Sequence, residues 1–192
     1  MASREVVRSP LRLRGTTRRP LDERLLLRFP SVFRLGAALT LRLRHGSRLR
    51  LALFRRAIQL VVDGQNRGDF EFTFALYSPG NELRNVTTGG ATAGILGLDD
   101  VYHGPDGVRR FFEGWAEPWE EWRWDPDGEV IDLGGGRGLV LLEVVGRGRG
   151  SGVEVREQVG LMGQLERGRV VWQRNWLGTG AWSEALRAAG VG

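Results

Sequence analysis

His103 is one of two histidines in the chain, and its neighbours make it a candidate general acid or base. Tyr102 stands beside it and Asp100 lies three residues earlier, so either side chain is a candidate to orient the imidazole. The alternative is structural, because His103 directly precedes a predicted helix start at Pro105 and is placed to cap that helix. No spacing links His103 to a second catalytic group, and we favour the structural interpretation.

Several classes of chemistry are excluded by residue types that the chain lacks. All 28 basic residues are arginine, which excludes a P-loop, a Schiff base and a kinase-type phosphate lysine. The absence of cysteine excludes thiol nucleophiles, disulfides and iron–sulfur sites. His45 and His103 are too few for a multi-histidine zinc site, and no carboxylate cluster has metal-ligand spacing. We therefore expect no metal and no cofactor.

The net charge of +5 conceals an uneven distribution along the chain. Residues 1–56 carry fifteen arginines and three acids, whereas the remainder carries thirteen arginines and twenty acids. The basic pI therefore describes the first third of the chain and not the rest. Arginine interrupts every apolar run, and none approaches the roughly 20 residues that span a bilayer. We expect a soluble, cytoplasmic protein.

Periodicity predicts helices first and strands afterwards. Apolar residues at helical spacing predict helices over residues 21–27, 32–43, 49–66, 70–76, 105–117 and 182–189. Alternation and β-forming residues predict strands over residues 82–86, 122–133, 139–145, 153–165 and 170–177. The last four strands, joined by glycine-rich turns, predict an antiparallel meander. The fold class is therefore α+β, with an Arg/Leu-rich helical extension over 1–46 and a domain over 47–192.

Four segments in this order resemble the SnoaL-like polyketide cyclase and ketosteroid isomerase superfamily, also called the nuclear transport factor 2-like fold. They are residues 66–70, residues 75–79 followed by Glu82, residues 102–111, and the last hairpin over 165–176. The resemblance runs from about residue 50 to the end. It implies a cone-like curved antiparallel sheet packed on N-terminal helices, a pocket between them, and a homodimer. The Arg-rich extension resembles one in some actinobacterial members.

The resemblance also implies acid–base positions, which carry other residue types here. The oxyanion-hole tyrosine of the isomerases falls on Val61, their general base on Asn85, and their second oxyanion acid on Leu161. The aspartate of epoxide hydrolases with this fold falls on Asn175. An amide or an alkyl group cannot serve as a useful base, so whether the protein is an enzyme stays open.

A two-residue turn at residues 167–168 predicts which strand residues share a face, because it pairs Glu166 with Arg169. The polar residues that this pairing groups together are Arg156, Gln158, Gln173 and Asn175. The resemblance implies that the residue at position 175 points inward, so we expect this face to line the pocket. These four polar side chains suit an anionic or carbonyl-bearing ligand. The alternative is a satisfied polar core. Glu157 is a candidate base if the register is off by one residue.

Four tryptophans, at positions 115, 119, 122 and 124, form a cluster in the sequence. They are suited either to stack on a flat ligand or to fill a core or a dimer face. We assign Trp115, with Tyr102, to the ligand pocket, and we prefer a core or dimer role for Trp119 and Trp122.

Two functions remain as hypotheses. The first is a small-molecule-binding SnoaL-like domain, and if it is an enzyme we expect a cofactor-free isomerase, cyclase or hydrolase. The second is a non-catalytic dimeric interaction module whose Arg-rich helices contact nucleic acid, membrane or a protein partner. For these helices we favour a simpler interpretation, in which their leucines pack on the domain or across a dimer and their arginines are solvated or paired.

Overall fold

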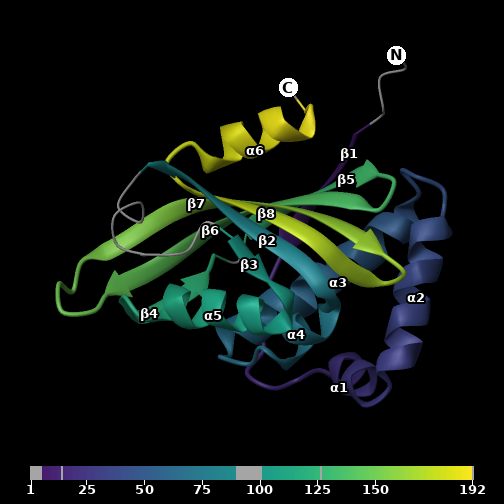
Figure 1. The fold of residues 1–192 in the computed structure, drawn as a ribbon, viewed down its shortest axis with the longest axis horizontal. Helices are drawn as coiled ribbons and strands as arrows, with labels where there is room; N and C mark the ends of the chain where they lie inside the picture. Colours follow the sequence, from purple (N-terminus) through teal and green to yellow (C-terminus); the bar gives the residue numbers. More distant parts are fainter. Residues whose placement is uncertain (1–5, 14, 90–100, 126, 192) are drawn as a thin grey trace.

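The structure, a computed structural model, describes residues 6–13, 15–89, 101–125 and 127–191. It is α+β, as predicted, with helices on both faces of one curved sheet (Figure 1). The helices are α1 (Leu21–Arg28), α2 (Pro30–Arg42), α3 (Arg48–Asn66), α4 (Glu71–Leu76), α5 (Gly104–Ala116) and α6 (Ala181–Ala189). The strands are β1 (Val7–Arg12), β2 (Tyr77–Gly89), β3 (Val101–His103), β4 (Trp119–Trp124), β5 (Asp127–Gly134), β6 (Arg137–Gly148), β7 (Glu154–Glu166) and β8 (Arg169–Gly178).

The strands form one mixed sheet in the order β1-β5-β6-β7-β8-β2-β3, and β4 also pairs with β6. The predicted antiparallel meander is present as β5 to β8. The prediction of a wholly antiparallel sheet is wrong at one place, because β2 and β8 run parallel. The strand predicted over 122–133 is two strands, since β4 and β5 pair with different halves of β6.

Each face of the sheet is covered by its own set of helices (Figure 1). Helices α3, α4 and α5 cover the concave face, and their apolar residues form the larger core cluster with residues such as Leu142 and Val159. Helix α6 covers the convex face, where Ala181 and Ala185 pack with Met162 and Trp176. Small side chains on α6 allow this close approach of helix and sheet. The concave layer positions the candidate site.

A β-bulge in the last hairpin decides which residues of β7 face the concave side. The turn pairs Glu166 with Arg169, as predicted, but the register shifts before Gln164 pairs with Trp172. One extra residue in β8 reverses the alternation beyond that point. Asn175 therefore pairs with Leu161, and odd-numbered residues of β7 share its face.

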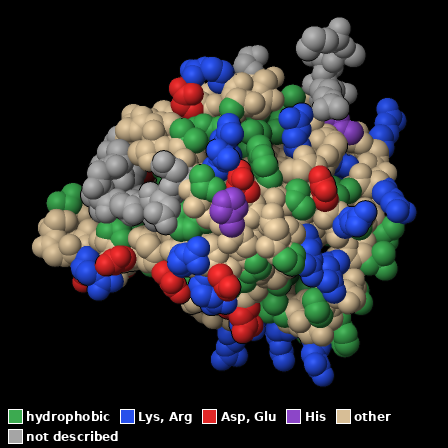
Figure 2. Space-filling view, in the orientation of Figure 1, with side chains coloured by type: hydrophobic (Ala, Val, Ile, Leu, Met, Phe, Trp, Pro, Cys, Tyr) green, Lys and Arg blue, Asp and Glu red, His purple; other side chains and the backbone are tan. Residues whose placement is uncertain are grey.

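The Arg-rich extension contributes a strand as well as helices. Its β1, which periodicity did not predict, pairs antiparallel with β5 and extends the sheet at one edge. Helices α1 and α2 follow at the side of the molecule, where arginine and hydrophobic side chains are mixed on the surface (Figure 2). Ion pairs join this extension to the rest of the chain. Arg8 and Arg19 of the extension pair with Glu129 and Asp69, and its acids Asp22 and Glu23 pair with Arg56 and Arg67.

The Arg19–Asp69 pair links the extension to the start of α4, and it predicts a pH effect. The hydrogen bond from Arg19 lowers the pKa of Asp69 below its usual 3.8. Because the folded-state pKa is lowered, the pair stabilises the fold at any pH above the unfolded-state pKa of Asp69. This contribution is lost as the pH falls through the folded-state pKa. We expect Arg19→Gln to cost up to about 1 kcal/mol at pH 7 because the pair is partly exposed.

Urea denaturation of both proteins at pH 7 and in strong acid measures this difference. The gap between wild type and Arg19→Gln should narrow in acid. A gap of the same size at both pH values would show that the pair does not cause the pKa shift.

Candidate functional site

A cavity of about 130 Å³ lies between the concave face of the sheet and helices α3, α4 and α5. Its wall is mainly apolar, and the aromatic residues in it are Phe54, Tyr77, Phe111, Phe112, Trp115 and Trp124. Its amide and hydroxyl side chains, apart from Tyr77, are Gln65, Thr73, Gln173 and Asn175. Within the described part of the chain, the wall has no carboxylate, imidazole or guanidinium. The cavity is therefore an uncharged, largely apolar site.

Helix α5 supplies the aromatic side of the cavity. Pro105 stands in its first turn, where the missing N–H costs no hydrogen bond, and Pro118 lies just beyond its end. Its apolar residues at positions 108, 111, 112 and 115 fall on one helical face, and that face is buried against the sheet. Trp115 is 2% exposed and stacks on Trp124 with ring centroids 6.1 Å apart and planes 15° apart.

A chain of neutral hydrogen bonds forms the polar side of the cavity on β2 and β8. The Tyr77 hydroxyl donates to Gln173 Oε1 at 2.8 Å, and Gln173 Nε2 donates to Asn175 Oδ1 at 2.7 Å. Asn175 Nδ2 in turn donates to Asn85 Oδ1 at 2.9 Å. Burial raises the pKa of Tyr77, which keeps its hydroxyl protonated. This chain offers dipoles to a ligand, and no fixed charge.

The helical side of the cavity carries one indole paired to a neighbouring amide and one, that of Trp115, whose buried N–H is unpaired among the described residues. Trp124 Nε1 donates to Gln65 Oε1 at 2.7 Å, and Gln65 Nε2 donates to Thr73 Oγ1 at 3.1 Å. Trp115 Nε1, in contrast, is buried without a hydrogen-bond partner among the residues that the structure describes. A buried N–H group without a partner costs free energy, and an acceptor atom that reached it would remove that cost.

The structure brings together three of the predicted pocket residues, because Trp115, Gln173 and Asn175 all line the cavity. Arg156 and Gln158 lie on the other face of β7, so their predicted grouping with Asn175 is wrong. The bulge in β8 is the cause. The Arg156 guanidinium bonds Asp125 and Glu143 at 2.6 and 2.7 Å on the surface.

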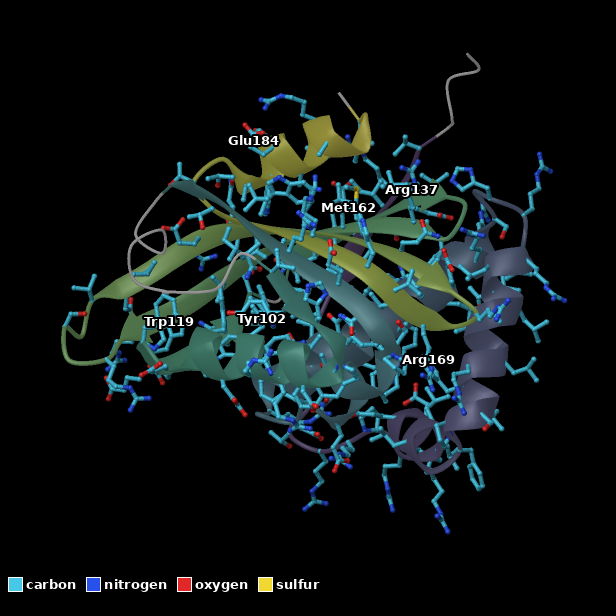
Figure 3. All side chains as sticks on the ribbon, viewed as in Figure 1. Tyr102, Trp119, Arg137, Met162, Arg169 and Glu184 are labelled. Carbon is cyan, nitrogen blue, oxygen red and sulfur yellow. The ribbon has the colours of Figure 1, made fainter. Side chains whose placement is uncertain are left out.

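The remaining predicted site residues lie around the cavity, outside its wall. Tyr102 is 4% exposed and packs edge-on to Phe111 between the sheet and α5 (Figure 3). His103 is exposed and occupies the N-cap position of α5, where its side chain makes no capping hydrogen bond. Glu157 is buried on the face of β7 that also carries Val159. Asp100 lies outside the described residues.

Sequence reasoning missed Tyr77, Gln65 and Thr73 as parts of the wall. Tyr77, at a strand start, is one of the residues that carried the resemblance, and Gln65, near a helix end, directly precedes another of them. Their positions within a helix or strand could have indicated that they face the cavity. Gln65, for example, lies on the same face of α3 as Val61 and Val62, which also line it. No three His, Asp or Glu side chains of the described chain are grouped to hold a metal ion.

Solved structures share this arrangement of helices and sheet. An NTF2-like protein of unknown function from Burkholderia pseudomallei is 22% identical, with a TM-score of 0.55 over 69% of this chain and 93% of that one. TerC, co-crystallised with polyporic acid, is 18% identical, with a TM-score of 0.54 over 69% and 96% of the two chains. The chain has the nuclear transport factor 2-like fold. The resemblance in the sequence is confirmed at this level.

A further NTF2-like structure, a protein from Jannaschia sp. described as a SnoaL-like polyketide cyclase, is 15% identical. It has a TM-score of 0.51 over 69% of this chain and 90% of that one. No family model matches the sequence, and no curated protein matches it either.

The four positions for which the resemblance implies acid–base residues lie in the cavity wall or beside it. Val61, Leu161 and Asn175 line the cavity, and Asn85 accepts a hydrogen bond from Asn175. Leu161 faces the cavity, while its neighbour Met162 faces α6 (Figure 3). The four positions for which the resemblance implies acid–base residues therefore hold two alkyl groups and two amides.

Proposed function

We propose that the protein binds a small, neutral, largely aromatic molecule that carries a hydrogen-bond acceptor such as a carbonyl oxygen. The observation that carries this proposal is the apolar, uncharged wall of the cavity. Trp115 belongs to that wall, and its buried, unpartnered indole N–H is the donor that we assign to the acceptor. An apolar cavity of about 150 Å³ accommodates benzene. The cavity here is similar, at about 130 Å³, so a single substituted ring suits it.

Neutrality of the ligand follows from the wall. A charged ligand would lose its hydration without meeting an opposite charge, and this loss is costly. The amide chain of Gln173 and Asn175 and the indole N–H of Trp115 instead suit a polar neutral group. The TerC complex with polyporic acid supports the use of this fold for small molecules.

The geometry supports binding better than proton abstraction. A base must reach the proton that it removes, and the described wall carries no carboxylate or imidazole. Any isomerase, cyclase or hydrolase activity would then depend on polarising a carbonyl through Trp115 Nε1 and the amides. Binding is the primary function that we propose, and polarisation is the chemistry that it allows.

Three ligands of similar size test the proposal. Acetophenone has a neutral acceptor, ethylbenzene has none, and benzoate is charged. Ligand-observed NMR titration of the full chain should show the tightest binding for acetophenone. Trp115→Phe should weaken acetophenone binding by up to about tenfold, because a net hydrogen bond contributes about 1 kcal/mol, and should leave ethylbenzene binding nearly unchanged.

Trp119→Phe is the matched control. Its indole N–H is also buried without a partner among the described residues, but Trp119 does not line the cavity. This variant should bind all three ligands as the wild type does. Preferred binding of benzoate, or equal loss of acetophenone in both variants, would contradict the proposal.

A further inference from the structure

Helices α1 and α2 each carry exposed apolar residues on their outer side, which we call the apolar stripe. Leu21 and Leu25 share a face of α1, Val32, Leu35 and Leu39 share a face of α2, and Phe29 lies at the joint between the helices. Their exposed fractions are Leu21 69%, Leu25 51%, Phe29 53%, Val32 63%, Leu35 61% and Leu39 50%. Phe29 lies between the two helices and joins their two halves. The stripe therefore consists of one exposed apolar face on each helix.

The inner sides of the same helices are fixed to the body of the protein. Glu23 of α1 is fully buried and pairs with Arg67 at 2.7 Å. Phe33 of α2 packs edge-on to Phe72 of α4, with centroids 5.3 Å apart. Leu25 lies two positions from Glu23, and Leu35 lies two positions from Phe33, so both point away from these anchors. The leucines of this stripe therefore do not pack on the domain, and their packing across a dimer stays a prediction.

Arginine predominates among the charged residues around the stripe. The segment from Arg24 to Val62 contains nine arginines and no aspartate or glutamate. Arg24, Arg28 and Arg42 are exposed, and none of them forms an ion pair with a described residue. Hydrophobic and arginine side chains are visible together on this side of the molecule (Figure 2). The surface is both apolar and strongly basic.

We propose that this surface binds an anionic lipid bilayer, with α1 and α2 lying in its interfacial layer. A second copy would bring the same uncompensated arginines against each other, which opposes a symmetric contact. Nucleic acid would use the arginines and leave six large apolar residues in water. An anionic lipid surface can bind both kinds of side chain. Its acyl chains contact the apolar stripe, and its headgroup phosphates and carboxylates pair with the arginines.

The contact would be superficial. Helix α2 has 13 residues, fewer than the about 20 that cross a bilayer. In the described residues, no helix is long and apolar enough to span a membrane. Long arginine side chains next to an apolar stripe can extend toward the headgroups while the stripe enters the layer below.

Vesicle co-sedimentation of the full chain tests this inference. Vesicles of phosphatidylcholine with phosphatidylserine should bind the protein, and vesicles of phosphatidylcholine alone should bind it at least about tenfold more weakly. Leu25→Gln with Leu35→Gln should weaken binding by about tenfold or more through the lost apolar contact. Arg28→Gln with Arg42→Gln should weaken it similarly, and added salt should reduce this second effect.

Val153→Gln is the matched control, because Val153 is also exposed, at 58%, but lies in the distant β6–β7 hairpin. It should bind vesicles as the wild type does. Equal binding to neutral vesicles, or no loss in the leucine variant, would overturn the inference. Failure of the wild type to sediment with anionic vesicles would also overturn it. In that case, a dimer that the leucine variant dissociates would indicate a contact between two copies, and RNA binding that needs the arginines but not the leucines would indicate a nucleic-acid surface.

Discussion

Replacing Arg50 with leucine is expected to lower the free energy of unfolding by about 3–5 kcal/mol, the range for breaking one partner of a buried ion pair. Arg50 and Asp132 have side chains that are 3% and 1% exposed. The guanidinium bonds both carboxylate oxygens, at 2.7 and 3.1 Å, and also donates to the carbonyl of Leu41 at 2.8 Å. Removing it would leave the Asp132 carboxylate buried without its main partner.

Urea denaturation monitored by tryptophan fluorescence measures this loss. Arg8→Gln is the control, because Arg8 also pairs with a residue of β5 but forms an exposed contact with Glu129 at 3.5 Å. It should cost less than about 1 kcal/mol. The double variant Arg50→Leu with Asp132→Leu should be more stable than Arg50→Leu, since the unpaired charge is gone. A double variant less stable than the single one would refute this account.

Gly178→Ala is expected to destabilise the protein by at least about 3 kcal/mol, the sum of an unfavourable backbone conformation and overpacking. Gly178 has a φ of +104°, and a Cβ there would lie 1.7 Å from the carbonyl oxygen of Gly89. The clash is with backbone, so no side-chain rotation relieves it. Strands β2 and β8 would have to separate at the place where they pair in parallel.

Gly180→Ala separates the two contributions. Gly180 also has a positive φ, +81°, but a Cβ there would meet no atom within 4 Å. We expect this variant to lose only about 1 kcal/mol, so the difference between the two variants measures the close approach of the strands. Thermal or chemical denaturation of both provides the comparison. Equal losses of unfolding free energy in the two variants would show that the contact with Gly89 does not contribute to the destabilisation.

The helices were predictable because their signals are local. The apolar face of α5 and the N-cap Ser47 before α3 can be recognised within a few residues of sequence, and both helices form as expected. Strand β1 was not predictable in the same way, because it finds its partner β5 more than a hundred residues later. Its own arginines and proline do not indicate a strand.

The site was predictable in part for a related reason. Trp115 and Asn175 were identified from helix phase and from the resemblance, and both line the cavity. Arg156 and Gln158 were placed on the wrong face because one bulged residue in β8 reverses the alternation, and periodicity cannot reveal a bulge. The unused N–H of Trp115 depends on which side chains surround it, which only three-dimensional packing determines.

The parallel pairing of β2 with β8 has a consequence for the order of events during synthesis. One edge of β2 pairs with β3, which follows soon in the chain, but its other edge must wait for β8, the last strand, and β1 must wait for β5. Until then, the early part of the nascent chain exposes leucines and unpaired strand edges. The fifteen arginines and three acids of residues 1–56 give this early segment a high positive charge, which opposes association between copies at that stage.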